Sequence, residues 1–189
     1  MYQIRIHGRG GQGVVTAAEL LSVAAFKAGR HAQAFPSFGS ERTGAPVVSY
    51  CRIDDRPIRL REPISNPDAL IVQDASLIAQ INVFSGVGEG ATILINSEHT
   101  LGELGIEDTG SATFAVLPAT QIALRHIGRP VPNAVLLGGF SALMPDLSID
   151  DVIAAINERF PGKVAAGNID AAREAADLVA GMSEEASHA

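Results

Sequence analysis

A glycine-rich run near the N-terminus has the residue types and spacing of an anion-binding loop. Its residues are Gly8, Arg9, Gly10, Gly11, Gln12 and Gly13, and an apolar helical pattern begins at Val14. Glycine permits positive φ and lets the backbone approach another group closely. A helix that starts directly after the loop offers free N–H groups and a partial positive charge to a phosphate or carboxylate. The run also suits a tight turn that only packs a helix onto a sheet, and the residues alone leave both interpretations open.

The glycine spacing also matches a dinucleotide fingerprint, but the rest of that pattern is missing. Gly8, Gly10 and Gly13 fit G-x-G-x-x-G, which is a weak signal by itself. A dinucleotide fold places an acidic residue at the end of the second strand, roughly 20 residues further on, to bind the ribose. The corresponding region, His31 to Pro36, contains no acid. The sequence therefore disfavours ordinary NAD binding.

A second loop, residues 36–46, carries a mixture of polar, apolar and rigid residues. It contains two prolines and two glycines, which are typical of an irregular segment. The candidate binding residues here are Phe35, which directly precedes the loop, and Ser37, Phe38, Gly39, Ser40, Glu41 and Arg42 within it. Loops of this kind often hold binding residues. The alternative is a surface loop whose single Glu–Arg pair contributes little to stability.

The sequence shows no complete catalytic apparatus. We find no cluster with metal-ligand spacing, no nucleophile elbow and no P-loop lysine. Cys51 is the only cysteine. One thiol excludes an internal disulfide and any iron–sulfur cluster held by several thiolates of this chain. We therefore expect neither catalytic residues nor a metal site here.

The elements that would position these loops alternate between strands and helices. Apolar runs predict strands at residues 2–6, 31–35, 47–53, 69–72, 91–95 and 113–117, with an edge strand at 57–61 that forms a hairpin with 47–53. Helical spacing predicts helices at 14–28, 75–83, 120–126, 134–143 and 149–160, and a last helix that Asn168 or Asp170 caps and that ends near Ala180. This alternation is typical of an α/β layered fold on a mostly parallel sheet. Ligands of such sheets lie beyond the carboxyl ends of the strands. The loops at 8–13 and 36–44 follow the first two strands, so we expect them at the same edge.

Composition and charge narrow the class of protein. The chain of 189 residues has a net charge of −7. Residues 1–62 contribute nine basic and five acidic residues (+4), which leaves five basic and sixteen acidic residues (−11) for the remainder. This asymmetry favours a small anionic ligand or an acidic partner over nucleic acid. No apolar run reaches the roughly 18 residues of a membrane span, and no signal peptide is visible. We expect no membrane association and a cytoplasmic protein with one domain, 1–181, and a flexible tail, 182–189.

Several motifs, in order along the chain to about residue 180, resemble the gamma subunit of 2-oxoacid:ferredoxin oxidoreductases, most closely the pyruvate type. They are the glycine run His7 to Gly13, the stretch Ala32 to Gly39 with Glu41-Arg42 and Gly44 to Val47, Pro132-Asn133 before Gly138, Glu158 to Lys163, and Asn168. The first two are specific in combination. The resemblance implies a three-layer α/β/α Rossmann-like domain with a mostly parallel, mixed-edge sheet.

The resemblance also implies an enzyme of several subunits. Alpha, beta and delta-type partners would hold thiamine diphosphate, magnesium and [4Fe–4S] clusters, and this chain alone would bind none of them. The reaction would decarboxylate pyruvate oxidatively onto coenzyme A with electrons passed to ferredoxin, or run in reverse. The gamma unit would pack on the thiamine diphosphate subunits and help to form the coenzyme A and substrate access region.

Carried over by position, both loops and Asn133 become candidate binding residues. Arg9 and Arg42 are candidates for pairing with coenzyme A phosphates, because the fork of a guanidinium suits phosphate. Many relatives have a second arginine where this chain has Thr43, which leaves the substrate open. Two alternatives remain: the same role with another 2-oxoacid (2-oxoglutarate, branched-chain or indolepyruvate), or a free-standing dinucleotide-binding protein.

Overall fold

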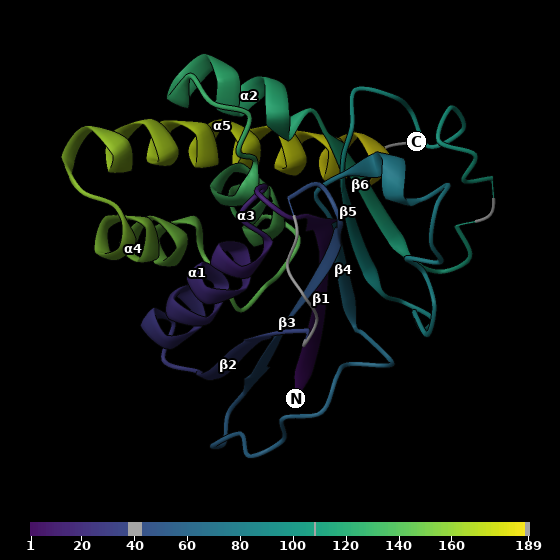
Figure 1. Ribbon diagram of the computed structural model, residues 1–189, viewed down its shortest axis with the longest axis horizontal. Coiled ribbons are helices and arrows are strands. Elements are labelled where there is room, and N and C mark those ends of the chain that lie inside the picture. Colours follow the sequence, from purple (N-terminus) through teal and green to yellow (C-terminus); the bar gives the residue numbers. More distant parts are fainter. Residues whose placement is uncertain (38–42, 108, 188–189) are drawn as a thin grey trace.

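The computed structural model describes residues 1–37, 43–107 and 109–187 and contains one six-stranded sheet with helices packed against it (Figure 1). The strands are β1 (Tyr2–Arg9), β2 (His31–Pro36), β3 (Pro46–Asp54), β4 (Ala69–Val72), β5 (Thr92–Asn96) and β6 (Thr113–Leu117). The helices are α1 (Val14–Lys27), α2 (Ala119–Ile127), α3 (Asn133–Ser141), α4 (Ile149–Arg159) and α5 (Gly162–Ser187). Among the described residues, no helix is both long and apolar enough to cross a membrane.

The sheet has the order β2-β3-β1-β4-β5-β6. Strands β1, β4, β5 and β6 are parallel, whereas β3 runs antiparallel between β1 and β2. The predicted α/β class with a mostly parallel, mixed-edge sheet is therefore confirmed. From β1 the chain first builds β2 and β3 on one side and then returns to β4 on the other. The switch point thus lies between β1 and β4, at the carboxyl end from which the glycine run emerges.

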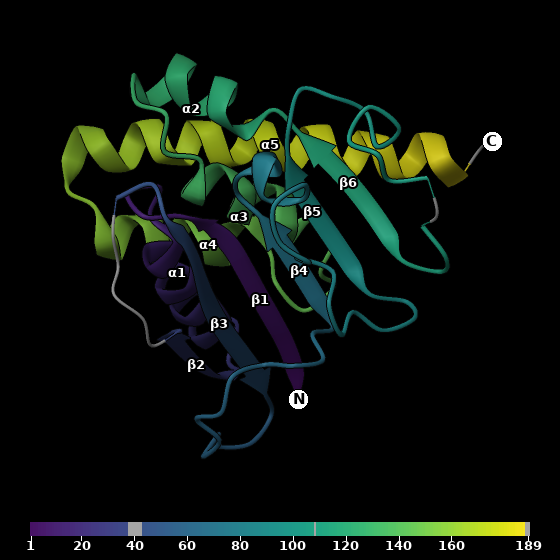
Figure 2. The ribbon, with the colours of Figure 1, turned by 45° about the vertical axis from the view of Figure 1, so that its right-hand side comes forward.

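The two faces of the sheet are covered differently (Figure 2). All five α-helices contribute to the core on one face, where α3 is entirely buried. The other face packs Leu70, Val72, Ile93 and Ile95 under the irregular segments 75–87, 101–107 and 109–112. The domain thus has three layers, but the second outer layer consists of turns and a 3₁₀ turn, η1 (Ala75–Leu77).

The predicted helix at 75–83 is wrong beyond its first turn. The Asp74 side chain accepts from the Ser76 backbone N–H and closes η1, and turns follow. The carbonyl groups of Val83 and Ser85 accept from the buried Arg5 guanidinium at 2.9 and 2.6 Å. A long-range cation therefore fixes the backbone here in an irregular conformation.

The predicted edge strand at 57–61 is also wrong, because β3 pairs with β1 along one edge and with β2 along the other. No edge of β3 remains for a hairpin partner. The residues instead form an irregular loop whose carbonyls at Leu60 and Glu62 accept from Arg52 at 3.4 and 2.7 Å.

The C-terminal half matches the prediction better, with one shift. The Ser148–Asp151 capping box starts α4 as predicted. The last helix begins at Gly162, so Asn168 is no cap: it lies inside α5 and donates to the Val164 carbonyl at 2.8 Å. The helix also continues to Ser187, past the predicted end near Ala180.

Candidate functional site

The glycine run connects β1 directly to α1, and its geometry requires glycine at two points. Gly11 and Gly13 have φ of 94° and 74°, values that side-chain-bearing residues rarely adopt. Gly13 is also the N-cap of α1, and glycine has no side chain with which to cap the helix. A Cβ on Gly13 would lie 2.6 Å from Nδ2 of Asn133, which is the first residue of α3. The structure therefore brings the predicted residues Gly13 and Asn133 together, with the N-termini of α1 and α3 side by side.

Arg9 and Gln12 converge on a carboxylate that lies directly after β4. Oδ2 of Asp74 accepts from Nε of Arg9 at 3.1 Å and from Nε2 of Gln12 at 2.8 Å. The Gln12 side chain also folds back to accept from the Arg9 backbone N–H at 2.7 Å. Burial raises the pKa of Asp74, but hydrogen bonds from Ser76 and Gln12 outweigh it and hold the pKa below its usual value. Asp74 is therefore ionised at neutral pH and ties the glycine run to β4 across the switch point.

The Arg9 guanidinium reaches three further acceptors. It donates to the Gly44 carbonyl at 3.1 Å, to Oγ of Ser76 at 2.7 Å and to Oε1 of Gln80 at 3.0 Å. Together with the bond to Asp74, these contacts engage all three nitrogen atoms of the guanidinium. In this structure Arg9 links the glycine run to the second loop and to η1.

The end of the second loop pairs with the glycine run through the backbone. The Gly10 N–H donates to the Ala45 carbonyl at 2.9 Å, and the Gly44 N–H donates to the Gly10 carbonyl at 3.0 Å. At the start of the loop, the Ser37 N–H donates to the Val48 carbonyl at 2.8 Å. The expectation that both loops meet at one edge of the sheet is confirmed for these residues. Of the predicted site, Phe38, Gly39, Ser40, Glu41 and Arg42 lie outside the described residues.

Phe35 belongs to an aromatic group on the face of the sheet opposite the helices. Its ring lies 5.0 Å from the Tyr50 ring, and the Arg52 guanidinium lies 5.1 Å from its centroid. Phe35 therefore packs against two side chains of β3 immediately before the second loop begins.

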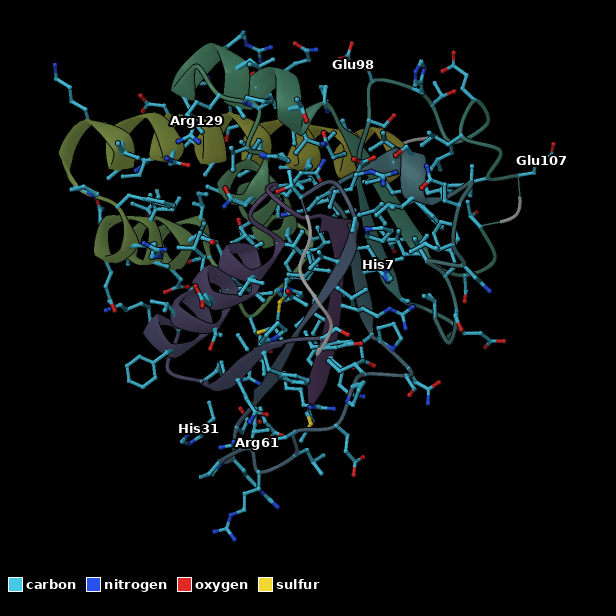
Figure 3. The ribbon with its side chains drawn as sticks, in the orientation of Figure 1. His7, His31, Arg61, Glu98, Glu107 and Arg129 are labelled. Atoms are coloured by element: carbon cyan, nitrogen blue, oxygen red, sulfur yellow. The ribbon has the colours of Figure 1, made fainter. Side chains whose placement is uncertain are left out.

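Two buried polar side chains near the switch point have no hydrogen-bond partner among the residues that the structure describes. Both ring nitrogens of His7 and both amide atoms of Gln73 are unpartnered, although the residues are only 5% and 1% exposed. Burial, with a smaller contribution from the charge of Arg5, lowers the pKa of His7 to about 4, so the ring is neutral. His7 is labelled in Figure 3.

Gln73 and Asp74 are the site residues that the sequence analysis missed. The dinucleotide pattern places its acid at the end of the second strand in sequence, whereas the parallel neighbour of β1 in space is β4, the fourth strand in sequence. The sequence signal for these two residues is their position directly after the buried strand Ala69–Val72, where a ligand-binding side chain of a parallel sheet is expected.

The described residues offer no metal site. No group of three or more histidine, cysteine or acidic side chains among them is placed to hold a metal ion. Cys51 is fully buried, and burial raises the pKa of its thiol to about 12. With one cysteine, this chain alone cannot hold an iron–sulfur cluster that requires several thiolates.

The fold and the loop pair define a class of protein: the chain belongs to the pyruvate ferredoxin/flavodoxin oxidoreductase family, whose model matches residues 3–178. It is a subunit of such an oxidoreductase, and the resemblance found in the sequence is confirmed. The pyruvate synthase subunit PorC of Methanothermobacter marburgensis is 47% identical over 173 residues, 92% of this chain and 94% of that protein.

Two further relatives agree. The common gamma subunit of the pyruvate and ketoisovalerate oxidoreductases of Thermococcus litoralis is 44% identical, over 93% of this chain and 95% of that one. The crystal structure of the pyruvate oxidoreductase subunit PORC of Thermotoga maritima superposes with a TM-score of 0.81 at 32% identity, covering 93% of this chain and 95% of that chain.

Proposed function

We propose that this chain is the gamma-type subunit of a pyruvate:ferredoxin oxidoreductase and that its glycine-run edge forms part of the coenzyme A and substrate access region. The observation that carries the proposal is the convergence of Gly8–Gly13, residues 43–45 and Asp74 at the switch point. In open α/β sheets that position is the one at which ligands bind. Relatives named as pyruvate synthase subunits cover nearly the same length.

In this proposal the chain supplies a surface and leaves the reacting atoms to its partners. Alpha, beta and delta-type subunits would hold thiamine diphosphate with magnesium, which activates the 2-oxoacid, and the [4Fe–4S] clusters that pass electrons to ferredoxin. The single cysteine of the chain supports this division, because a [4Fe–4S] cluster held by four thiolates would need another chain. The contribution of this chain is to bind and orient coenzyme A beside the thiamine diphosphate subunits.

Arg42 is the residue we propose for pairing with the phosphates of coenzyme A. The sequence makes Arg9 an equal candidate, but in the structure its guanidinium donates to Asp74, Gly44, Ser76 and Gln80. We therefore propose that Arg9 acts indirectly, by holding the end of the loop that carries Arg42 next to the glycine run.

The test is carried out on the complete complex, purified without oxygen. Native mass spectrometry should show this chain with larger subunits, and dye reduction should require both pyruvate and coenzyme A. Arg42→Ala should raise the KM for coenzyme A about tenfold, equivalent to about 1.4 kcal/mol, and leave the KM for pyruvate unchanged. Arg129→Ala, an exposed arginine in the segment between α2 and α3, is the control. An unchanged KM for coenzyme A in Arg42→Ala would remove Arg42 from the proposal.

A second candidate is the same subunit role with another 2-oxoacid. It is favoured by the Thermococcus litoralis relative, a gamma subunit that two oxidoreductases share, and by Thr43 in place of an arginine. Dye reduction with pyruvate, 2-oxoisovalerate, 2-oxoglutarate and indolepyruvate separates the two, since only the true substrate should give a high kcat/KM.

A further inference from the structure

An exposed basic segment follows β3 at the end of the sheet opposite the glycine run. We define the basic loop as residues 55–62. Its three arginines, Arg56, Arg59 and Arg61, are exposed, and Leu60 between two of them is 48% exposed. In Figure 3 Arg61 lies at the lower end of the molecule with His31, far from the edge that carries the candidate site. The function proposed above does not use this surface.

Two buried arginines hold the basic loop in one conformation. Arg52 is 3% exposed and donates to the carbonyls of Leu60 and Glu62. Arg5 is 7% exposed and donates to the carbonyls of Ile64 and Ser65, just beyond the loop. Among the described residues, neither guanidinium pairs with a carboxylate. A buried cation without an anion is costly unless hydrogen bonds satisfy it. The sheet thus uses two such cations to fix the backbone of a solvent-exposed segment.

The positive charge of the basic loop is not neutralised within the described part of the chain. The acids that precede its arginines are already paired: Asp54 with the N-terminal amine at 3.4 Å and Asp55 with Arg30 at 2.9 Å. The side chains of Arg56, Arg59 and Arg61 form no ion pair or hydrogen bond with any described residue. Glu62 is the remaining acid of the loop, so an excess of positive charge faces solvent.

We propose that the basic loop binds an acidic surface of another subunit of the same oxidoreductase, with Leu60 entering an apolar depression at its centre. An exposed apolar side chain flanked by arginines is the composition of an interface anchor, and a preformed loop pays little ordering entropy on binding. The partner is a resident subunit and not the ferredoxin, because this chain has a single, buried cysteine, so the clusters that pass electrons to ferredoxin would lie in another chain. This inference rests on the proposed subunit role.

The first test compares two charge reversals of equal size in the co-expressed complex. One variant carries Arg56→Glu, Arg59→Glu and Arg61→Glu. The control carries Arg129→Glu, Lys163→Glu and Arg173→Glu, exposed cations on the α2–α5 side. We expect the basic-loop variant to dissociate from the complex at a protein concentration at least tenfold above that of the wild type, and the control to assemble normally. Thermal unfolding of each free chain confirms folding.

The second test identifies the chemistry of the partner. In the complex with Arg59→Lys and Arg61→Lys, a carbodiimide joins a lysine directly to a carboxylate that it contacts, and mass spectrometry identifies both residues. A cross-link to an Asp or Glu of a different subunit supports the proposal. Cross-links only within this chain or to a second copy of it, or full assembly of the charge-reversed variant, would overturn it. If the wild-type chain itself fails to assemble with larger subunits, the proposed function fails first, so the two failures are distinguishable.

Discussion

The packing of α3 against α5 predicts a large penalty for one added methyl group. A Cβ on Gly138 would lie 2.6 Å from both Cα and the carbonyl carbon of Ala172, and nearer still to the carbonyl oxygen. These atoms belong to the backbone of α5, so the helices must move apart to accept it. Overpacking of this kind costs about 1–3 kcal/mol or more, whereas the better helix propensity of alanine recovers at most about 1 kcal/mol. We expect Gly138→Ala to lower the free energy of unfolding by about 1–2 kcal/mol.

The matched control is Gly181→Ala in α5, where a Cβ would meet no atom within 4 Å. That substitution should be neutral or raise the free energy of unfolding by up to about 1 kcal/mol. Urea unfolding of the full chain, monitored by circular dichroism, measures the free energy of unfolding of both variants. In a thermal unfolding experiment, each kcal/mol corresponds to a change of about 2–4 °C in Tm. Equal stability of the two variants would refute the close contact between the helices. In the assembled enzyme, Gly138→Ala should also disturb Asn133, because both residues lie on α3.

Three further predictions concern the site and the core. Arg9→Met should increase hydrogen exchange at the Gly44 amide, since the guanidinium holds that segment; unchanged exchange there would show that Arg9 does not clamp it. The pKa of Asp74 in the folded protein is held below its usual 3.8. The difference in the free energy of unfolding between the wild type and Asp74→Asn should therefore be fully present above pH 4 and should shrink as the pH falls through the folded pKa. A difference that stays constant down to pH 2 would contradict this. Burial raises the pKa of the Cys51 thiol to about 12. The thiol should therefore not react with a thiol reagent at pH 8 in the native protein, and should react in urea, where it is exposed.

The strands and the glycine run were predictable because their signals are local. Six apolar runs gave six strands within a residue or two, except for β1, which continues to Arg9. The glycines between β1 and α1 marked the turn because only glycine adopts φ of 94° and 74° at low cost. The meeting of the two loops followed from the rule that parallel strands end at one edge.

The errors share a physical cause, which is that distant arginines fix the backbone. Residues 57–61 and 75–83 have plausible periodicity, but their carbonyls or those beside them accept from Arg52 and Arg5. Nothing in the local pattern reveals a hydrogen-bond donor 78 residues away in the chain, as for Val83. Asp74 was missed for a related reason, because the order of strands in space differs from their order in sequence.

The complete burial of α3 has a consequence for the synthesis of the chain. Every residue of α3 is buried, and α5, which follows α3 in the chain and leaves the ribosome after it, packs against it. Until the 26 residues of α5 emerge, the apolar surface of α3 that they cover faces solvent, and exposed apolar surface of this kind promotes aggregation. A chaperone or a partner subunit that acts on this protein at that stage of translation would therefore meet α3 as an exposed apolar segment.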